Sequence, residues 1–275
     1  MKNIKTYILP LIILIFTITA CDVIEEPYLV PLGEKPPEPG VKVKKLLLEE
    51  FTGHKCPNCP EATEEAKNLK GIYGDQIVIL AIHAGNLATP DASGLYTADF
   101  TTSTGNTVYA KYDPGYVPCG NVNRMNEKAE FYTSWQTDVE TLLAEPQEAN
   151  IIINSTFDDI NFALDVTVDV EFLVDLTGTY NLCFYVLESG IIAPQLSDTG
   201  DIPVYQHDHM LRGSHGGAWG LEIASGNILA GETASKEFQV TIDQGWIPQE
   251  TSVVAFITDD ATFRVLQAEE KHIIE

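Results

Sequence analysis

The chain has 275 residues, of which 44% are hydrophobic and 20% charged, proportions that are typical of globular proteins and exclude a disordered or fibrous chain. Sixteen basic residues stand against forty acidic ones, so the formal net charge is -24 at pH 7, which disfavours nucleic acid as a partner because its phosphates would be repelled. Five cysteines are too few for a small fold held by disulfides, so their positions matter more than their number.

Residues 1–20 have the pattern of an export signal. Two lysines precede an uncharged, mostly apolar run that is shorter than the roughly 20 residues a membrane-spanning helix needs. The run ends in Ile-Thr-Ala directly before Cys21, and small residues before a cysteine resemble the lipobox of bacterial lipoproteins. We therefore expect cleavage before Cys21 and acylation of this residue as a lipid anchor, with an ordinary cleavage site and a chance cysteine as the alternative.

Residues 21–40 predict a tether between the anchor and the folded part of the chain. Five prolines in this stretch interrupt any helix or strand and favour an extended, semi-rigid spacer. A disordered tether is the alternative, and it has the same consequence for function.

Residues 41–146 predict an α/β domain with the element order of a thioredoxin-like fold, in which a CxxC motif lies between a strand and a helix. An apolar run after the helix suits a central parallel strand that is covered on both faces. The expected elements are a strand at 43–51, a helix at 60–73, a strand at 76–83, a long loop at 84–106 and a helix at 131–144.

The motif Cys56-Pro-Asn-Cys59 carries the predicted chemistry of this domain. A thiolate at a helix N-terminus faces unpaired N–H groups and the positive end of the helix dipole, so the pKa of Cys56 should be lowered. Cys59 lies one turn further and can resolve a mixed disulfide on Cys56, so the pair needs no other cofactor. A static disulfide and half of a metal site are the alternatives. Glu50, near the end of the first strand, is a candidate for the buried carboxylate that accepts a proton in a thioredoxin-like site.

The step Val117-Pro118 resembles a second thioredoxin landmark, a cis proline before a strand. In that family the proline loop lies against the CxxC and pairs with the substrate chain, and we carry this role over to Pro118 only. A trans proline in a plain turn is the alternative. Cys119 is either a third redox thiol or, the favoured interpretation, a small buried residue.

Residues 147–275 predict an all-β domain. Apolar side chains alternate with polar ones from 164 to 172, which indicates one buried and one solvent-facing side. About seven strands without a helical period favour an antiparallel β-sandwich of immunoglobulin-like type, with Cys183 as a buried core thiol. Strands are expected at 164–172, 180–187, 236–242, 253–258 and 263–269, with hairpin turns at Asp158-Asp159 and Asp259-Asp260.

The stretch 205–220 breaks this alternation, because it is rich in histidine, glycine and aromatic residues. Its three histidines could bind a metal, but histidine more often satisfies local hydrogen bonds, so we expect no metal. The glycines neither follow a strand nor open a helix, which disfavours a phosphate-binding loop. We expect a loop that packs on the first domain or on a partner, with His207, His209, Arg212 and His215 as candidate binding residues.

Three motifs together resemble a known family: Glu-Phe-Thr-Gly-x-x-Cys-x-x-Cys-Pro from Glu50, Asn-x-Asn-Arg from Asn121, and His-x-His-x-Leu-Arg from His207 with a later Trp-Gly. The combination is similar to the outer membrane protein 28-related lipoproteins. The resemblance covers most of the mature chain. It implies a thioredoxin-like domain joined to a β-sandwich and a lipid anchor in the outer membrane, with a periplasmic or surface-exposed position. It implies no settled activity.

Two functional hypotheses follow. The first is a lipid-anchored thiol-disulfide oxidoreductase of the cell envelope that acts on thiols and disulfides of exported proteins. The second is a binding or adhesion lipoprotein with an envelope or surface partner, in which Cys56 and Cys59 form a structural disulfide. Accessibility separates the two, because an oxidoreductase needs an exposed Cys56 whereas a structural pair should be buried and inert.

Overall fold

The computed structural model describes residues 42–274, which belong to one compact unit. The predicted export signal, Cys21 and the proline-rich tether lie outside the described residues. Within residues 42–274, no helix has both the length and the apolar character that crossing a membrane would require.

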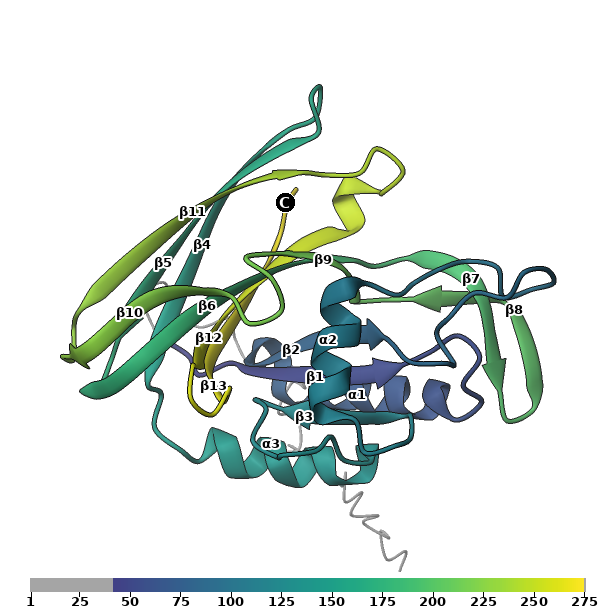
Figure 1. The fold of residues 1–275 in the computed structure, drawn as a ribbon, viewed down its shortest axis with the longest axis horizontal. Helices are drawn as coiled ribbons and strands as arrows, with labels where there is room; N and C mark the ends of the chain where they lie inside the picture. Colours follow the sequence, from purple (N-terminus) through teal and green to yellow (C-terminus); the bar gives the residue numbers. More distant parts are fainter. Residues whose placement is uncertain (1–41, 275) are drawn as a thin grey trace, which may run out of the picture. The chain divides into compact units, whose positions relative to one another are not determined.

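Strands β1 (Leu46–Thr52) and β2 (Ile77–His83) pair in parallel, and helix α1 (Cys59–Tyr73) connects them (Figure 1). All residues of both strands are buried, which suits strands in the middle of a sheet. Strand β3 (Cys119–Val122) pairs antiparallel with the other edge of β1. The strand, helix and strand expected before residue 84 are confirmed, with small shifts of their ends.

Helix α2 (Ser103–Tyr112) begins inside the stretch expected to be a loop. Its N-terminus is capped by Thr102, whose side-chain oxygen accepts a hydrogen bond from the amide of Gly105 at 2.9 Å. A Cβ on Gly105 would lie 2.9 Å from Cγ2 of Ile82, so glycine permits this close approach of the helix to β2. The expected closing helix is confirmed as α3 (Trp135–Leu143), which follows a short 3₁₀ turn.

Two layers of antiparallel strands pack face to face in the C-terminal half (Figure 1). One layer has the order β11-β5-β4, and the other contains β10, β6, β12 and β13. Alternate residues of β5 such as Val166 meet alternate residues of β6 such as Leu182 and Phe184 in one core, so the alternation predicted at 164–172 is confirmed. The strands are β4 (Ala149–Asp158), β5 (Ala163–Phe172), β6 (Leu176–Glu188), β10 (Leu221–Ile228), β11 (Thr233–Thr241), β12 (Thr251–Asp259) and β13 (Val265–His272).

The sheet that contains β6 continues into the first half of the chain, in the order β13-β12-β6-β9-β2-β1-β3. Strand β9 (Met210–His215) joins the halves, because it pairs antiparallel with β6 and touches β2 in parallel at Ala81 and Met210. Residues of β6 that face away from the sandwich core, such as Tyr185 and Leu187, pack in a second core with residues of β1 and β2. The halves predicted as separate domains therefore share a sheet and a core.

The expectation of a loop at 205–220 is wrong, because this stretch contains the end of strand β8, a tight turn and strand β9. The turn is made by His209, whose φ of 54° is left-handed. Met210 and Leu211 are buried, which explains why the chain returns at once to the sheet. Contrary to the expectation, the glycines at 216 and 217 directly follow a strand. Strands β7 (Ile191–Ser197) and β8 (Gly200–His207) form a hairpin that was not expected (Figure 1).

Candidate functional site

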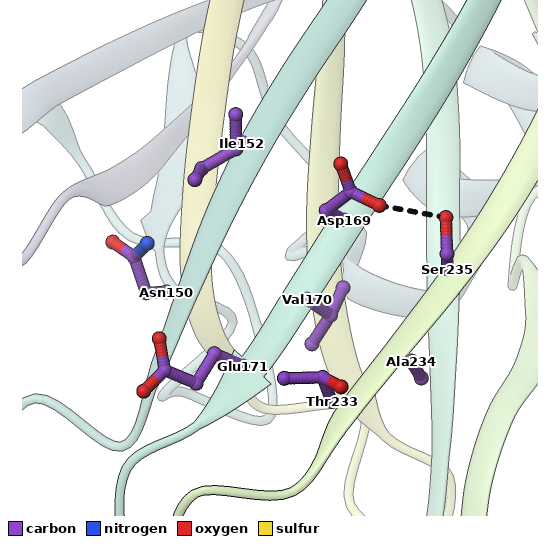
Figure 2. Close-up of a pocket in the computed structure, with 8 residues that line it drawn as sticks. All are labelled: Asn150, Ile152, Asp169, Val170, Glu171, Thr233, Ala234 and Ser235. Atoms are coloured by element: carbon purple, nitrogen blue, oxygen red, sulfur yellow. Dashed lines mark hydrogen bonds between the residues drawn. The ribbon is translucent and has the colours of Figure 1, made fainter.

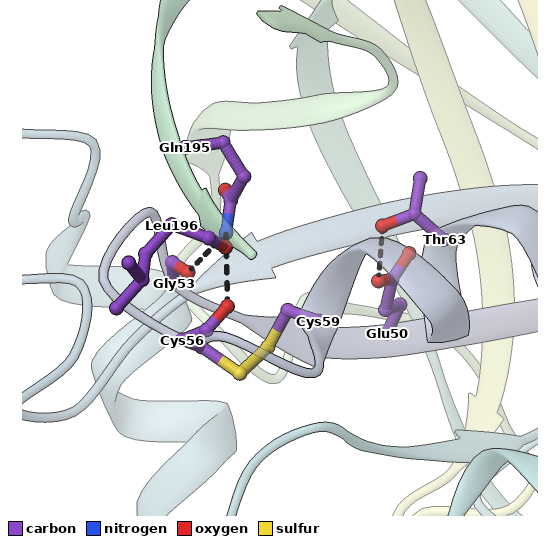
Figure 3. The surroundings of a disulfide bond; sticks show 7 residues. All are labelled: Glu50, Gly53, Cys56, Cys59, Thr63, Gln195 and Leu196. Atoms are coloured by element: carbon purple, nitrogen blue, oxygen red, sulfur yellow. Dashed lines mark hydrogen bonds between the residues drawn. A yellow bond between two sulfur atoms is a disulfide. The ribbon is translucent and has the colours of Figure 1, made fainter. Parts of the chain in front are cut away.

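Cys56 and Cys59 form a disulfide at the N-terminal end of α1, where the CxxC motif was expected (Figure 3). Cys59 is the first residue of the helix, and Pro60 lies in its first turn. Backbone N–H groups in the first turn have no hydrogen-bond partner within the helix, so the missing N–H of proline costs nothing there. The disulfide therefore lies between the end of β1 and the positive end of the α1 dipole.

Strand β7 covers the loop that carries Cys56. The side-chain amide of Gln195 donates hydrogen bonds to the carbonyl oxygens of Cys56 at 3.0 Å and Gly53 at 3.3 Å (Figure 3). The backbone amide of Leu196 donates to the carbonyl oxygen of His54 at 2.8 Å. Cys56 and Cys59 are each only 1% exposed, so solvent and thiols have almost no access to the disulfide in this conformation.

The loop after β2 also contacts the CxxC loop, from a side other than that of β7. The backbone amide of Lys55 donates to the carbonyl oxygen of Leu87 at 3.0 Å, and its ammonium pairs with Asp91 at 2.8 Å. A Cβ at Gly53 would lie 2.6 Å from the carbonyl of Leu87, so only glycine fits between the two segments. The CxxC loop is thus fixed by contacts with two segments that are distant in sequence.

Glu50 is buried behind the start of α1. The Oγ1 of Thr63, one helical turn beyond Cys59, donates to the Oε1 of Glu50 at 2.7 Å (Figure 3). Burial raises the pKa of Glu50 to about 7, and the hydrogen bond from Thr63 opposes the rise. A carboxyl group with this pKa can take up or release a proton near neutral pH.

The Val117–Pro118 peptide bond is cis, as predicted, and Pro118 is buried directly before β3. Cys119 pairs opposite Phe51 of β1 and belongs to the core that both halves share. Burial raises the pKa of the Cys119 thiol to about 12, and the same cause raises that of Cys183 to about 12. Both thiols are free and buried, which supports the interpretation of each as a core residue.

Three buried histidines surround the ring of Phe100 next to the CxxC loop. The centroids of the His54, His83 and His207 rings lie 5.5, 5.4 and 5.3 Å from that of Phe100. Five of their six ring nitrogens have no hydrogen-bond partner. Burial lowers the pKa of His207 to about 4 and that of His83 well below its usual value, so these rings are neutral. In the described part of the chain, no cluster of His, Cys, Asp or Glu is arranged to hold a metal ion.

The other candidate binding residues of the stretch 205–220 do not join this cluster. His209 lies 3.9 Å from a carboxylate oxygen of Glu270, and the ring of His215 contacts Phe184. Arg212 pairs with Glu188 at 3.3 Å and lies over the ring of Trp246. The structure therefore places His207, His209, Arg212 and His215 in separate surroundings.

Sequence reasoning missed the partners of His207, because His54, His83 and Phe100 come from segments far apart in the chain. The three histidines share one feature in the sequence, which is that each lies at or just after the end of a strand. His83 is the last residue of β2, His207 is the last residue of β8, and His54 follows β1. Strands β1 and β2 pair with each other, but β8 pairs only with β7, so the meeting of these ends depends on how the β7–β8 hairpin packs on the first half of the chain.

A shallow depression of 490 Å³ lies on the outer face of the three-stranded sheet (Figure 2). Its lining comes from β4, β5 and β11, and Asp169 accepts a hydrogen bond from Ser235 at 2.7 Å. Asp169 and Glu171 line it, and the ammonium of Lys42 pairs with Glu171 at 2.6 Å.

The family model of outer membrane protein Omp28 matches residues 105–275. Among solved structures, HBP35 of Porphyromonas gingivalis is similar with a TM-score of 0.64 and 16% identity, over 85% of this chain and 76% of that chain. A protein of Agrobacterium tumefaciens is similar with a TM-score of 0.53 and 14% identity, over 86% of this chain and 97% of that chain. At these identities the similarity concerns the fold alone. No curated protein matches the chain.

Proposed function

The chain belongs to the Omp28 family of outer membrane proteins, and from this premise we propose that it is a lipid-anchored thiol-disulfide oxidoreductase of the cell envelope. Family membership supports the location in the envelope. The lipobox-like residues before Cys21 support the anchor. Other exported proteins with thiols or disulfides would be the substrates.

The position of the Cys56–Cys59 disulfide at the N-terminus of α1 is the observation that carries the redox proposal. A thioredoxin-like interpretation of residues 41–146 is supported by the parallel pair β1–β2, the antiparallel β3 and the cis bond before Pro118. In this arrangement the helix dipole would stabilise a thiolate on Cys56, which lies three residues before the first residue of α1.

The exchange begins from the reduced pair. The Cys56 thiolate attacks a substrate disulfide, forms a mixed disulfide and displaces one substrate thiolate. The Cys59 thiol then loses its proton and attacks the sulfur of Cys56, which releases the second substrate thiolate and leaves the Cys56–Cys59 disulfide. The dithiol is oxidised and the substrate disulfide is reduced by the same two electrons. Glu50 is the candidate acceptor of the Cys59 proton, because Thr63 links it to the next turn of α1.

Burial of the disulfide favours a second candidate, a binding protein in which the pair is static. Both cysteines are 1% exposed, and a substrate sulfur needs access to one of them. Exchange therefore requires strand β7 to move away from the CxxC loop, with loss of the hydrogen bonds made by Gln195 and Leu196.

A redox titration of the chain from residue 22 onward distinguishes the two candidates. Alkylation and mass analysis report the state of Cys56 and Cys59, and buried Cys119 serves as an internal control. We expect a reversible couple between about -120 and -270 mV, and turnover of a disulfide-bonded protein that Cys56→Ser abolishes. A couple below about -300 mV without turnover would overturn the oxidoreductase and leave the binding protein.

A further inference from the structure

Buried histidines lie on both sides of the contact between the CxxC loop and the β7–β8 hairpin. His54 is two residues before Cys56, and the backbone amide of Leu196 in β7 donates to its carbonyl oxygen at 2.8 Å. His207 is the last residue of β8, and its ring contacts that of His83 at the end of β2, with 5.4 Å between the centroids. Opening of the hairpin therefore separates His207 from the other two rings.

This contact is dry and offers the three rings few polar partners. His54, His83 and His207 are 1%, 4% and 5% exposed, and five of their six ring nitrogens have no hydrogen-bond partner in the described part of the chain. A void between His54, Phe100 and Pro194 of β7 measures 10 Å³, about the minimum that one water molecule needs. The closed hairpin thus leaves little room for water to hydrate a charged ring.

The charges around the rings do not compensate for this burial. The charged groups that face the three histidines are Lys55, Asp91, Asp99, Asp208 and Arg212. Two of the acids are partly offset, because Asp91 pairs with Lys55 at 2.8 Å and Asp208 lies 3.6 Å from Lys67. Protonation of one ring also opposes protonation of its neighbours. Burial lowers the pKa of all three histidines.

The rings of two tyrosines contact the histidines as well. Tyr96 stacks on His54, and Tyr205 of β8 lies 4.9 Å from His207 between centroids. Burial raises the pKa of each tyrosine to about 12, so both stay neutral in weak acid and at neutral pH. The histidines are therefore the groups in direct contact here whose charge changes between pH 7.5 and pH 5.

The hairpin is a separate two-stranded sheet, so it can move without loss of pairing in the other sheets. The contacts that hold it include the hydrogen bonds of Gln195 and Leu196, and a hydrogen bond from Tyr96 to Asp201 of β8. The ion pair of Lys67 with Asp208 persists in weak acid, because the pKa of Asp208 is lowered by hydrogen bonds and by Lys67 in spite of its burial. A few local contacts thus hold the hairpin closed.

We propose that His207 makes the β7–β8 hairpin a latch over the Cys56–Cys59 disulfide that acid releases. When the hairpin is open, water hydrates the His207 ring and the ring binds a proton below pH 6.5. When the hairpin is closed, the same ring binds a proton only near pH 4. Acid therefore favours the open form and exposes the disulfide. The latch governs access alone, so it holds whether the pair exchanges with substrates or is static.

The size of the effect follows from proton linkage. A group whose pKa is about 4 in the closed form and about 6.5 in the open form raises the ratio of open to closed molecules about 30-fold between pH 7.5 and pH 5. The rate at which a reductant reaches the disulfide through the open form should rise by the same factor.

The test measures reduction of the Cys56–Cys59 disulfide by tris(carboxyethyl)phosphine at pH 7.5 and pH 5, in the oxidised chain from residue 22 onward. The phosphine attacks one sulfur, takes an oxygen from water to become a phosphine oxide and leaves two thiols, so the reaction needs no thiolate. Each rate is divided by that of oxidised glutathione, an exposed disulfide, at the same pH. Alkylation and mass analysis at timed intervals follow the reaction.

The decisive comparison is with His207→Phe, because Glu50 also titrates between these pH values and lies near Tyr205 of the hairpin. The unaltered chain and the variant share every titrating group except His207. We expect the ratio of the rate at pH 5 to that at pH 7.5 to be about 30-fold larger in the unaltered chain. His207→Gln should behave like His207→Phe, which separates loss of the charge from a change in packing.

His215→Gln is the matched control. Burial lowers the pKa of His215 too, but its ring contacts Phe184 of β6 and not the hairpin. This variant should keep the pH response of the unaltered chain. Hydrogen exchange, corrected for the intrinsic rate at each pH, should show acid-enhanced opening of the amides of β7 and β8 but not of β2.

Two results would overturn the latch. One is an equal pH response in His207→Phe and the unaltered chain. The other is exchange in acid that increases in β2 as much as in the hairpin, because this would show unfolding of the whole chain. No protein substrate is present in these measurements, so failure of the latch is distinguishable from failure of the exchange activity, which the redox titration and turnover report.

Discussion

The side-chain amide of Gln195 donates a hydrogen bond to the carbonyl oxygen of Cys56 at 3.0 Å, across 139 positions of sequence. A strand from the second half of the chain thus closes over a disulfide in the first half. The same amide also binds the carbonyl oxygens of Gly53 and Leu196, so one side chain connects the CxxC loop to β7. This contact holds β7 against the loop of the buried disulfide.

Replacement of Gln195 by alanine should therefore speed reduction of the disulfide. The variant loses hydrogen bonds to the CxxC loop that are each worth about 0.5–1.5 kcal/mol, so we expect the rate of reduction by dithiothreitol to rise about tenfold. Alkylation and mass analysis at timed intervals measure it. Gln239→Ala, which removes an exposed amide on β11, is the control and should not change the rate. An unchanged rate in Gln195→Ala would show that β7 does not limit access.

Glu50→Gln should change how stability depends on pH. Burial raises the pKa of Glu50 to about 7 from 4.5, so the folded chain binds a proton that the unfolded chain releases. The contribution of this group to stability is present below pH 4.5 and declines as the pH rises to 7, by the order of 3 kcal/mol. We expect the variant to gain stability relative to the unaltered protein between pH 5 and pH 8.

Urea unfolding of the oxidised proteins at both pH values measures this gain. Thr63→Val, which removes the hydrogen bond to Glu50, is a useful companion and should raise the pKa of Glu50 further. A difference between Glu50→Gln and the unaltered protein that is the same at pH 5 and pH 8 would contradict the prediction.

The histidines around Phe100 should destabilise the fold in acid. Burial lowers the pKa of His207 to about 4, so the unfolded chain binds a proton near pH 6.5 that the folded chain does not. The contribution of His207 is present above pH 6.5 and is lost as the pH falls to 4, again by the order of 3 kcal/mol. We expect His207→Phe to flatten this acid limb of a plot of stability against pH.

Burial is the main cause that keeps His207 neutral, and the charge of His54 acts in the same direction. Hydrogen bonds to the backbone of Pro194 and Ala193 and the charge of Asp208 favour the protonated ring but do not outweigh burial. His272→Gln, at an exposed position, is the control and should leave the acid limb unchanged. If His207→Phe loses stability in acid as steeply as the unaltered protein, the cluster is not responsible.

Two bidentate ion pairs in this chain should differ widely in their importance. The Arg124–Glu49 pair is fully buried, whereas the Arg264–Glu148 pair is partly exposed with similar distances. Glu49→Gln leaves an uncompensated buried charge, and we expect a loss of about 3–5 kcal/mol. Glu148→Gln should cost about 1 kcal/mol or less, because water screens the remaining arginine. Equal losses in urea unfolding would contradict this ranking.

The sequence predicts elements well where local pattern and packing agree. The apolar run of β2 and the alternation in β5 leave little choice of structure, and the CxxC marks the start of α1. Helix α2 is missed because Gly105 and Asn106 are poor helix formers, and packing of Val108 and Tyr112 against the core overrides that preference.

The hairpin β7–β8 is missed for a related reason. Pro194 and Pro203 lie within its strands, and proline normally argues against a strand. The hairpin forms a separate two-stranded sheet, where missing N–H groups are tolerated. The burial of the CxxC therefore could not be predicted, because it depends on this hairpin and on contacts between distant segments.

Strand β6 faces two cores at once, with Leu182 and Phe184 on one side and Tyr185 and Leu187 on the other. Because synthesis proceeds from the N-terminus, the residues of β1 and β2 are made long before those of β6, which packs against them in the folded protein. During that interval the apolar side chains of Phe51 and Leu80 lack the residues of β6, β12 and β13 with which they share a core in the folded protein. Nascent and truncated forms of this protein are therefore the species most exposed to proteolysis and aggregation. A chaperone that shields them would act before residue 188 leaves the ribosome.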